Sequence, residues 1–183
     1  MDAYVTLVTS DFYVPGAEAL ARSLRRSGTR RPLVVMVTPR VSGADRLRAL
    51  GCEVRVAEAL PLSEEFRRLH SSTSVHARDP FTRGDKPVQH ECLDNFLKLR
   101  CWEYEEFEKI VFLDADTLVV RNIDRLFTYP AFTAAPNLYQ DMSDLLRMNS
   151  GVFVAAPGRA VFADMLRVLN EGGRVYRRTR SEE

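Results

Sequence analysis

The sequence has few cysteines and no long apolar run, and these shortages exclude several classes of protein. Its three cysteines, Cys52, Cys92 and Cys101, lack Cys-x-x-Cys spacing and cannot all pair within one chain. We therefore expect reduced, partly buried thiols and no disulfide framework. No apolar run approaches the length of about 20 residues that crosses a bilayer, so no membrane span is expected. Nor does a charged-then-apolar leader open the chain, and we expect a cytoplasmic protein.

Neither positive nor negative charge is in marked excess. The chain has 26 Lys and Arg against 25 Asp and Glu, for a net charge of +1. This balance argues against a nucleic-acid binder held by a broad phosphate-contacting face. With 183 residues, 45% of them hydrophobic, the chain fits one globular domain. We place that domain at 1–170, followed by a charged tail at 171–183, and leave a homo-oligomer open.

The first sixty residues alternate between strand and helix patterns. Apolar strands are expected at 4–9, 33–37 and 52–56, with helices at about 15–24 and 44–50. Pro15 fits the first turn of the first helix, and Gly28 is a natural stop after it. This order predicts an α/β fold with a mostly parallel sheet. Ligands of such sheets bind beyond the carboxyl ends of the strands.

The middle of the chain, from His70 to His90, is irregular and predicts a long surface loop. The spacing of His70, His76 and His90 matches no familiar metal-ligand pattern, so we expect solvent-exposed histidines.

A helix is expected from about Glu91 to Phe107, with Lys98 and Trp102 away from its apolar stripe. Lys98 has two interpretations. It can form an i,i+4 ion pair with Asp94, worth a few tenths of a kcal/mol, or it can lie beside the phosphates of a substrate.

The most informative segment, Val111–Val119, is an apolar strand that runs directly into two acids. In extended backbone, residues two apart point to the same side, so Asp114 and Asp116 would face one way. Two ionised carboxylates so close repel each other unless a positive charge lies between them. A hard divalent cation such as Mg²⁺ or Mn²⁺, itself holding substrate phosphates, meets that need. The structural alternative is a strand that ends in a solvated acidic turn.

The last third of the chain continues the α/β pattern. A helical turn is expected at 122–127, strands at 131–135 and 152–155, and a helix at 160–169. Asn149, Ser150 and Gly151 precede the second of these strands. They are either an ordinary polar turn or a sugar-holding segment in which Gly151 admits close backbone approach.

Four segments together resemble glycosyltransferase family eight, which includes glycogenin and galactinol synthase. They are Val5–Tyr13, Lys98–Trp102, Val111–Val119 with Asn122-Ile123-Asp124, and Asn149–Val154. Each segment is weak alone, but the four occur in the family's order over 1–170. The resemblance implies a GT-A fold, a Rossmann-like nucleotide-diphospho-sugar transferase. It also implies retaining transfer of a hexose from a UDP-sugar to an acceptor, with Mn²⁺ or Mg²⁺ bound.

The resemblance also implies roles for individual residues. Leu7, Thr9 and Tyr13 match contacts to uracil and ribose, and Lys98 matches a donor contact. Asp114 and Asp116 match the metal ligands, with Ala115 against the donor nucleotide. Asn149 and Ser150 match contacts to the donor sugar. Arg83 or Lys86 could supply a further cation that the family carries upstream of its helix lysine.

The family pattern continues further than the sequence given. The family has an Asp-Gln pair and a later His-x-x-Gly-x-x-Lys-Pro segment, whereas this chain has Arg177–Ser181 where Asp-Gln is expected. No catalytic residue is therefore assigned. A truncated member is the favoured interpretation, ahead of a naturally short one or one half of a two-chain protein. We expect weak donor binding and poor turnover.

Three other functions fit parts of the pattern. A nucleotide-sugar-binding remnant or subunit without catalysis is the main alternative. A haloacid-dehalogenase-like phosphatase also has an apolar strand before Asp-x-Asp. In those phosphatases, however, the motif lies near the start of the chain and has Thr or Val two positions after its second Asp, whereas here the motif lies past the midpoint and that position is Leu118. A nucleotidyltransferase carries a Gly-rich, Lys-bearing loop after its first strand, which 10–16 lacks.

Overall fold

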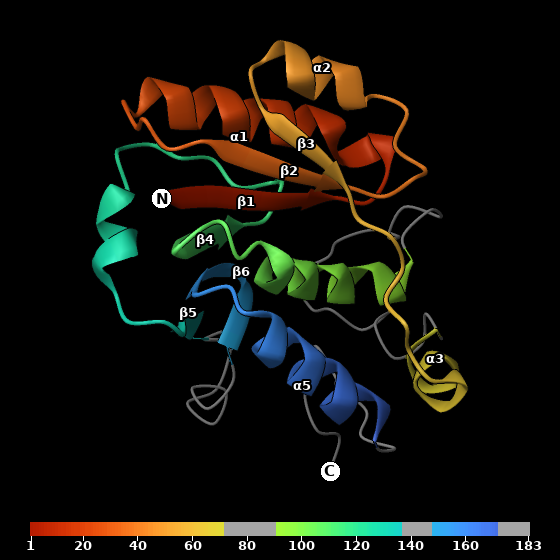
Figure 1. The fold of residues 1–183 in the computed structure, drawn as a ribbon. Coiled ribbons are helices and arrows are strands. Elements are labelled where there is room, and N and C mark those ends of the chain that lie inside the picture. The colour runs from red at the N-terminus through yellow and green to blue at the C-terminus, as the bar shows by residue number, and fades with distance from the viewer. Residues whose placement is uncertain (72–90, 137–147, 172–183) are drawn as a thin grey trace.

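The computed structural model describes residues 1–71, 91–136 and 148–171, and over these residues it forms a six-stranded sheet covered on both faces (Figure 1). The α/β prediction is confirmed. The strands are β1 (Asp2–Val8), β2 (Leu33–Val37), β3 (Glu53–Val56), β4 (Lys109–Leu113), β5 (Thr133–Pro136) and β6 (Met148–Ala155). The α-helices are α1 (Val14–Arg26), α2 (Ala44–Ala49), α3 (Glu64–His70) and α5 (Arg159–Asn170), and the 3₁₀ helices are η1 (Asp11–Tyr13), η2 (Cys92–Glu103) and η3 (Asp124–Thr128).

The sheet has the strand order β3-β2-β1-β4-β6-β5 and is parallel across its first four strands. β6 is antiparallel to β4, and β5 is antiparallel to β6. Because β6 runs the opposite way, its first residues lie beside the carboxyl end of β4. This reversal brings two polar segments that are distant in the sequence to one edge of the sheet.

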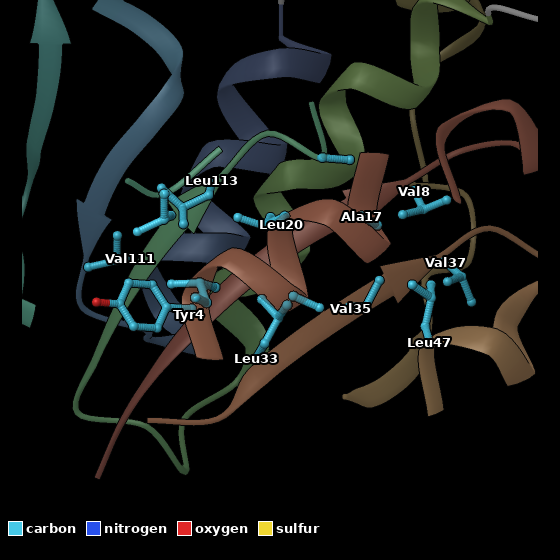
Figure 2. Close-up of a cluster of buried hydrophobic side chains, with 14 of the residues drawn as sticks. Tyr4, Val8, Ala17, Leu20, Leu33, Val35, Val37, Leu47, Val111 and Leu113 are labelled. Atoms are coloured by element: carbon cyan, nitrogen blue, oxygen red, sulfur yellow. The ribbon is translucent and has the colours of Figure 1, made fainter. Parts of the chain in front are cut away.

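Side chains of β1 alternate between two cores because successive residues of a strand point to opposite faces. Tyr4 and Val8 pack with α1 and α2 in one cluster (Figure 2), whereas Val5 and Leu7 pack toward η2 and α5. Figure 1 shows α1 and α2 on one side of the sheet, with η2 in green and α5 in blue on the other. Both faces are buried, as the uninterrupted apolar strands predict.

The boundaries of α1 follow the expected signals. Pro15 lies in its first turn, and Gly28 follows its end with φ +81°, a conformation that favours glycine. Arg25 and Arg26 in the last turn complement the negative end of the helix dipole.

The predicted helix at 91–107 is a 3₁₀ helix, η2, over Cys92–Glu103. With three residues per turn, positions i and i+4 no longer face each other, and Asp94 pairs with Arg40 instead of Lys98. Trp102 does not lie apart from the apolar side: it is buried and stacks on Phe153 of β6, with ring centroids 5.5 Å apart. The i,i+4 interpretation of Lys98 is therefore excluded, and the placement of Trp102 away from the apolar stripe was wrong.

His70 is fully buried, so the prediction of an exposed histidine was wrong for this residue. Its ring stacks on Phe66 at a centroid distance of 4.0 Å, and its Nδ1 lies 2.9 Å from the Phe66 carbonyl oxygen. One turn of α3 separates the two residues, so the helix itself brings the rings together. His76, His90, Arg83 and Lys86 lie outside the described residues.

A polar cluster around Asp124 lies near the amino ends of the parallel strands, at the edge of the sheet opposite Asp114 and Asp116. Tyr4 and Thr29 both donate hydrogen bonds to Asp124 Oδ1, at 2.7 and 2.6 Å, and the Arg31 guanidinium lies 2.9 Å from Asp124 Oδ2. Burial opposes ionisation of Asp124, but these hydrogen bonds and the Arg31 charge lower its pKa overall. Burial and the Asp124 hydrogen bond raise the pKa of Tyr4. The Asn-Ile-Asp segment thus ties η3 to β1.

Three further expectations concern a membrane span, the thiols and the end of the domain. Within the three described stretches, no helix is both long and apolar enough to span a bilayer. Cys52 and Cys101 are free thiols, and burial raises the pKa of each. The tail beyond residue 171 lies outside the described part of the chain, so the division at 170 stays a prediction.

Candidate functional site

The polar segments converge at the carboxyl edge of the parallel strands. Asp114 directly follows β4, and its backbone N–H donates to the Gly151 carbonyl oxygen at 2.9 Å. This bond extends the antiparallel β4–β6 ladder by one residue. The acids at 114–116 and the polar segment at 149–151 are therefore neighbours, as the sugar-holding interpretation requires.

The two acids lie on a tight turn and not on extended backbone. β4 ends at Leu113, and the Thr117 N–H donates to the Asp114 carbonyl oxygen at 3.0 Å, which closes a four-residue β-turn. The expectation that Asp114 and Asp116 share one strand face was therefore wrong. Asp114 is half-buried, Ala115 is buried in the core, and Asp116 is exposed with no ion pair or hydrogen bond among the residues described.

Lys98 reaches this turn from η2. Its Nζ lies 2.6 Å from Asp114 Oδ1, 3.2 Å from the Ser150 carbonyl oxygen and 3.3 Å from Ser150 Oγ. The ammonium also lies over the Phe112 ring, 5.1 Å from its centroid. The structure excludes one of the two interpretations of Lys98: its carboxylate partner is Asp114, the first acid of the motif, and Asp94 pairs with Arg40. The place of Lys98 beside substrate phosphates stays a prediction.

Residues 149–151 form the start of β6 and not a turn. The register between β5 and β6 is irregular here, since Ala134 pairs with Phe153 and Ala135 with Asn149. The Asn149 Oδ1 accepts a hydrogen bond from the Gly151 N–H at 2.7 Å. A Cβ on Gly151 would lie 2.9 Å from Asn149 Oδ1 and 3.1 Å from Asp114 Oδ2. The side chains of Asn149 and Asp114 thus leave no room for a Cβ at Gly151.

The other predicted donor contacts lie around the end of β1. Leu7 is 8% exposed and belongs to the core on the η2 side. Thr9 follows β1, and its carbonyl oxygen accepts a hydrogen bond from the Thr38 hydroxyl at 2.9 Å. Tyr13 lies half-buried just before α1, edge-on to the exposed ring of Phe12. The role of these three residues as nucleoside contacts stays a prediction.

Asp11 has a structural role at this edge. Its carboxylate accepts hydrogen bonds from Ser42 Oγ and the Gly43 N–H, at 2.6 and 2.8 Å. These bonds lower the pKa of Asp11. Asp11 therefore holds the start of α2 against the loop that follows β1.

Gly16 is a site residue that pattern reasoning missed. A Cβ on Gly16 would lie 2.8 Å from the Ala115 carbonyl oxygen and 3.7 Å from the Asp116 Cα. The first turn of α1 thus rests directly on the acidic turn, with no side chain between them. A glycine early in a helix, where alanine is the better helix former, was the available signal.

The donor set fits a hard divalent cation that shares its shell with a ligand. Among the described residues, no group of three or more His, Cys, Asp or Glu side chains could enclose a metal ion. Asp114 and Asp116 alone provide two carboxylates from one turn. Mg²⁺-type sites commonly use one or two carboxylates and complete the shell with waters and substrate phosphates. The pair therefore fits a cation carried with a phosphate ligand, and not a closed structural site.

Comparison with solved structures identifies the class of fold. A structure of the galactosyltransferase LgtC, solved with donor and acceptor sugar analogs, covers 94% of this chain and 67% of its own, with a TM-score of 0.58 at 16% identity. Mouse xyloside xylosyltransferase 1 covers 91% of this chain and 72% of its own, with a TM-score of 0.51 at 16% identity. The chain has the GT-A fold of these glycosyltransferases, which confirms the fold prediction.

The chain belongs to glycosyl transferase family 8, whose family model matches residues 4–137. It is 34% identical over 173 residues to UDP-glucuronate:xylan alpha-glucuronosyltransferase 1 of Arabidopsis thaliana, across 93% of this chain and 22% of that protein. It is 37% identical over 173 residues to human glycogenin-1, across 93% of this chain and 44% of that protein. The chain therefore spans less than half the length of these curated relatives.

Proposed function

We propose that this chain binds a UDP-sugar together with Mn²⁺ or Mg²⁺ at Asp114 and Asp116, and transfers its hexose with retention to an acceptor. The observation that carries the proposal is the position of the Lys98 ammonium, which lies beside Asp114, the first acid of the turn, and beside Ser150 of β6. Membership of family 8 supports the reaction class. The name of the Arabidopsis relative, which includes UDP-glucuronate, supports a UDP-sugar donor.

Departure of a nucleoside diphosphate concentrates negative charge on its phosphate oxygens. A divalent cation on the two carboxylates supplies charge stabilisation for that leaving group. Lys98 of η2 adds a fixed positive charge beside that turn, and its N–H groups can donate charge-assisted hydrogen bonds to the phosphates. Because Lys98 is 14% exposed, its charge is less screened there than on the open surface.

We assign the residues around Asp114 and Asp116 to two parts of the donor, the nucleoside and the sugar. We assign uracil and ribose to Leu7, Thr9 and Tyr13, with Ala115 against the nucleotide. Leu7 lies near the end of β1, Thr9 and Tyr13 follow that strand, and Ala115 follows β4 at the same edge. We assign the donor sugar to the start of β6, at 149–151. The amide of Asn149 and the hydroxyl of Ser150 offer hydrogen bonds that suit sugar hydroxyls.

The acceptor is proposed only as a class. Names of the relatives refer to xylan in one case and to glycogenin in the other, so a glycan, a protein and a small molecule all stay within the proposal. The alternative is that the chain binds the donor without transferring its sugar. Because that alternative shares the donor site, binding and transfer need separate assays.

Isothermal titration calorimetry with UDP tests the donor site, with and without Mn²⁺, in the wild type and in Asp116→Asn. We expect Mn²⁺ to strengthen UDP binding in the wild type. Asp116→Asn should weaken UDP binding in the presence of Mn²⁺ by about tenfold or more, since the cation loses one of its two protein carboxylates. With EDTA present, the variant should bind UDP no more weakly than the wild type, because a negative charge near the phosphates has been removed.

Asp45→Asn is the matched control. Asp45 is exposed on α2 and, among the residues that the structure describes, pairs with Arg48 on the same helix turn. We expect its substitution to leave both titrations unchanged. Equal Mn²⁺-dependent affinity in the wild type and Asp116→Asn would exclude Asp116 as a ligand. Incubation with UDP-glucose or UDP-glucuronate and detection of released UDP then separates transfer or hydrolysis from binding alone.

A further inference from the structure

Lys98 fills all of its hydrogen-bonding capacity with Asp114 of the acidic turn and Ser150 of β6. An ammonium group has three N–H donors, and three acceptors lie within 3.3 Å of Lys98 Nζ: one Asp114 carboxylate oxygen and two oxygens of Ser150. The Phe112 ring lies beneath the same ammonium. The lysine is therefore held as a counter-cation of Asp114, and does not extend freely toward solvent.

The two carboxylates of the motif consequently differ in availability. Asp114 Oδ1 is engaged by the ammonium, and Oδ2 faces Gly151, where even a Cβ would lie at 3.1 Å. Asp116 is exposed and has no ion pair within the described chain. A cation arriving alone would meet one free carboxylate and one that already carries a positive partner, and the two positive charges would repel each other.

A diphosphate changes this balance because its oxygens can accept the hydrogen bonds that Lys98 gives to Asp114. Phosphate oxygens form strong, charge-assisted hydrogen bonds with ammonium groups. Once Lys98 donates to phosphate, Asp114 regains a free oxygen for a cation. The same phosphate supplies further oxygen ligands to that cation.

We propose that Lys98 acts as a positioning residue that couples cation binding to diphosphate binding. It suppresses binding of a divalent cation alone, and it releases Asp114 when a nucleoside diphosphate accepts its ammonium. The proposal rests on the proposed donor site, and it adds that the two ligands bind with strong positive cooperativity that depends on one side chain. Such coupling is reciprocal, so the cation strengthens diphosphate binding by the same factor.

The test measures free Mn²⁺ by electron paramagnetic resonance during titration of the wild type and Lys98→Met, each with and without saturating UDP. Lys98→Met keeps most of the apolar stem but removes the charge. We expect it to bind Mn²⁺ alone about tenfold more tightly than the wild type, because Asp114 is freed. Its affinity for UDP should fall, and the factor by which UDP strengthens Mn²⁺ binding should shrink by about tenfold or more.

Two control variants and a second substitution keep the result specific. Arg121→Gln removes one exposed positive charge elsewhere on the chain and should leave Mn²⁺ binding unchanged. The double variant Lys98→Met/Asp114→Asn should lose the gain in Mn²⁺ affinity, because the gain acts through Asp114. Lys98→Gln provides the same test with a polar side chain, should Lys98→Met fold poorly.

The outcomes separate the two proposals. Equal Mn²⁺ affinity of the wild type and the Lys98 variants without UDP, with UDP still strengthening Mn²⁺ binding in each, would overturn the coupling and leave the donor site intact. Absence of Mn²⁺ binding to the wild type at any UDP concentration would overturn both. A gain in Mn²⁺ affinity in Lys98→Met that the Asp114→Asn change abolishes supports the coupling.

Discussion

Asp114→Asn should abolish cation-dependent UDP binding, with a loss of about 100-fold or more, which is larger than we expect from Asp116→Asn. The change removes a cation ligand and also the carboxylate that holds Lys98 at 2.6 Å. Calorimetry with UDP and Mn²⁺ measures the loss. A titration that matches the wild type would exclude Asp114 from the donor site.

The same pair of variants should differ in stability. Asp114→Asn breaks an ion pair whose lysine is 14% and whose carboxylate is 34% exposed. We expect a loss of about 1 kcal/mol in the free energy of unfolding, below the value for a fully buried pair because solvent screens it. Asp116→Asn should leave stability within about 0.5 kcal/mol of the wild type, since Asp116 is exposed. Urea denaturation followed by circular dichroism distinguishes the two variants.

Asp124→Asn should lower the free energy of unfolding by about 2 to 3 kcal/mol at neutral pH, although it lies at the edge opposite the acids. The amide can still accept hydrogen bonds from Tyr4 and Thr29, but it places an N–H group or a neutral oxygen beside the Arg31 guanidinium. Urea denaturation at pH 7 provides the measurement, with Asp45→Asn as the exposed control.

The pH dependence of that difference follows from the lowered pKa of Asp124. A carboxylate with a lowered pKa in the folded state stabilises the fold fully above its unfolded pKa of about 3.9. That contribution is lost as the pH falls through the lower, folded-state value. The gap in stability between the wild type and Asp124→Asn should therefore be widest near neutral pH and narrow below about pH 4. A gap that stays constant across this range would show that the charge of Asp124 is not what stabilises the cluster.

Local patterns in the sequence predicted most of the fold. Uninterrupted apolar runs at β1, β2 and β4 identified the buried strands, and Pro15 and Gly28 identified the limits of α1. These signals act within a few residues and depend on backbone chemistry, so they survive without knowledge of the tertiary structure.

Features set by long-range contacts could not be predicted in the same way. The antiparallel direction of β6 places Gly151 against Asp114, and no local pattern specifies it. The 3₁₀ geometry of η2 decides that Lys98 pairs with Asp114 and not with Asp94. The burial of His70 could not be predicted from the sequence, because it depends on aromatic neighbours that the fold brings together.

The proposed function requires a divalent cation that joins Asp114 and Asp116 to a diphosphate. A crystal grown with UDP and MnCl₂, measured at the manganese absorption edge, tests this directly. We predict an anomalous peak about 2.1 Å from carboxylate oxygens of both acids, with UDP phosphates in its shell and Lys98 turned from Asp114 to a phosphate oxygen. Bound UDP whose phosphates lie away from the acidic turn, or manganese coordinated elsewhere, would contradict the account.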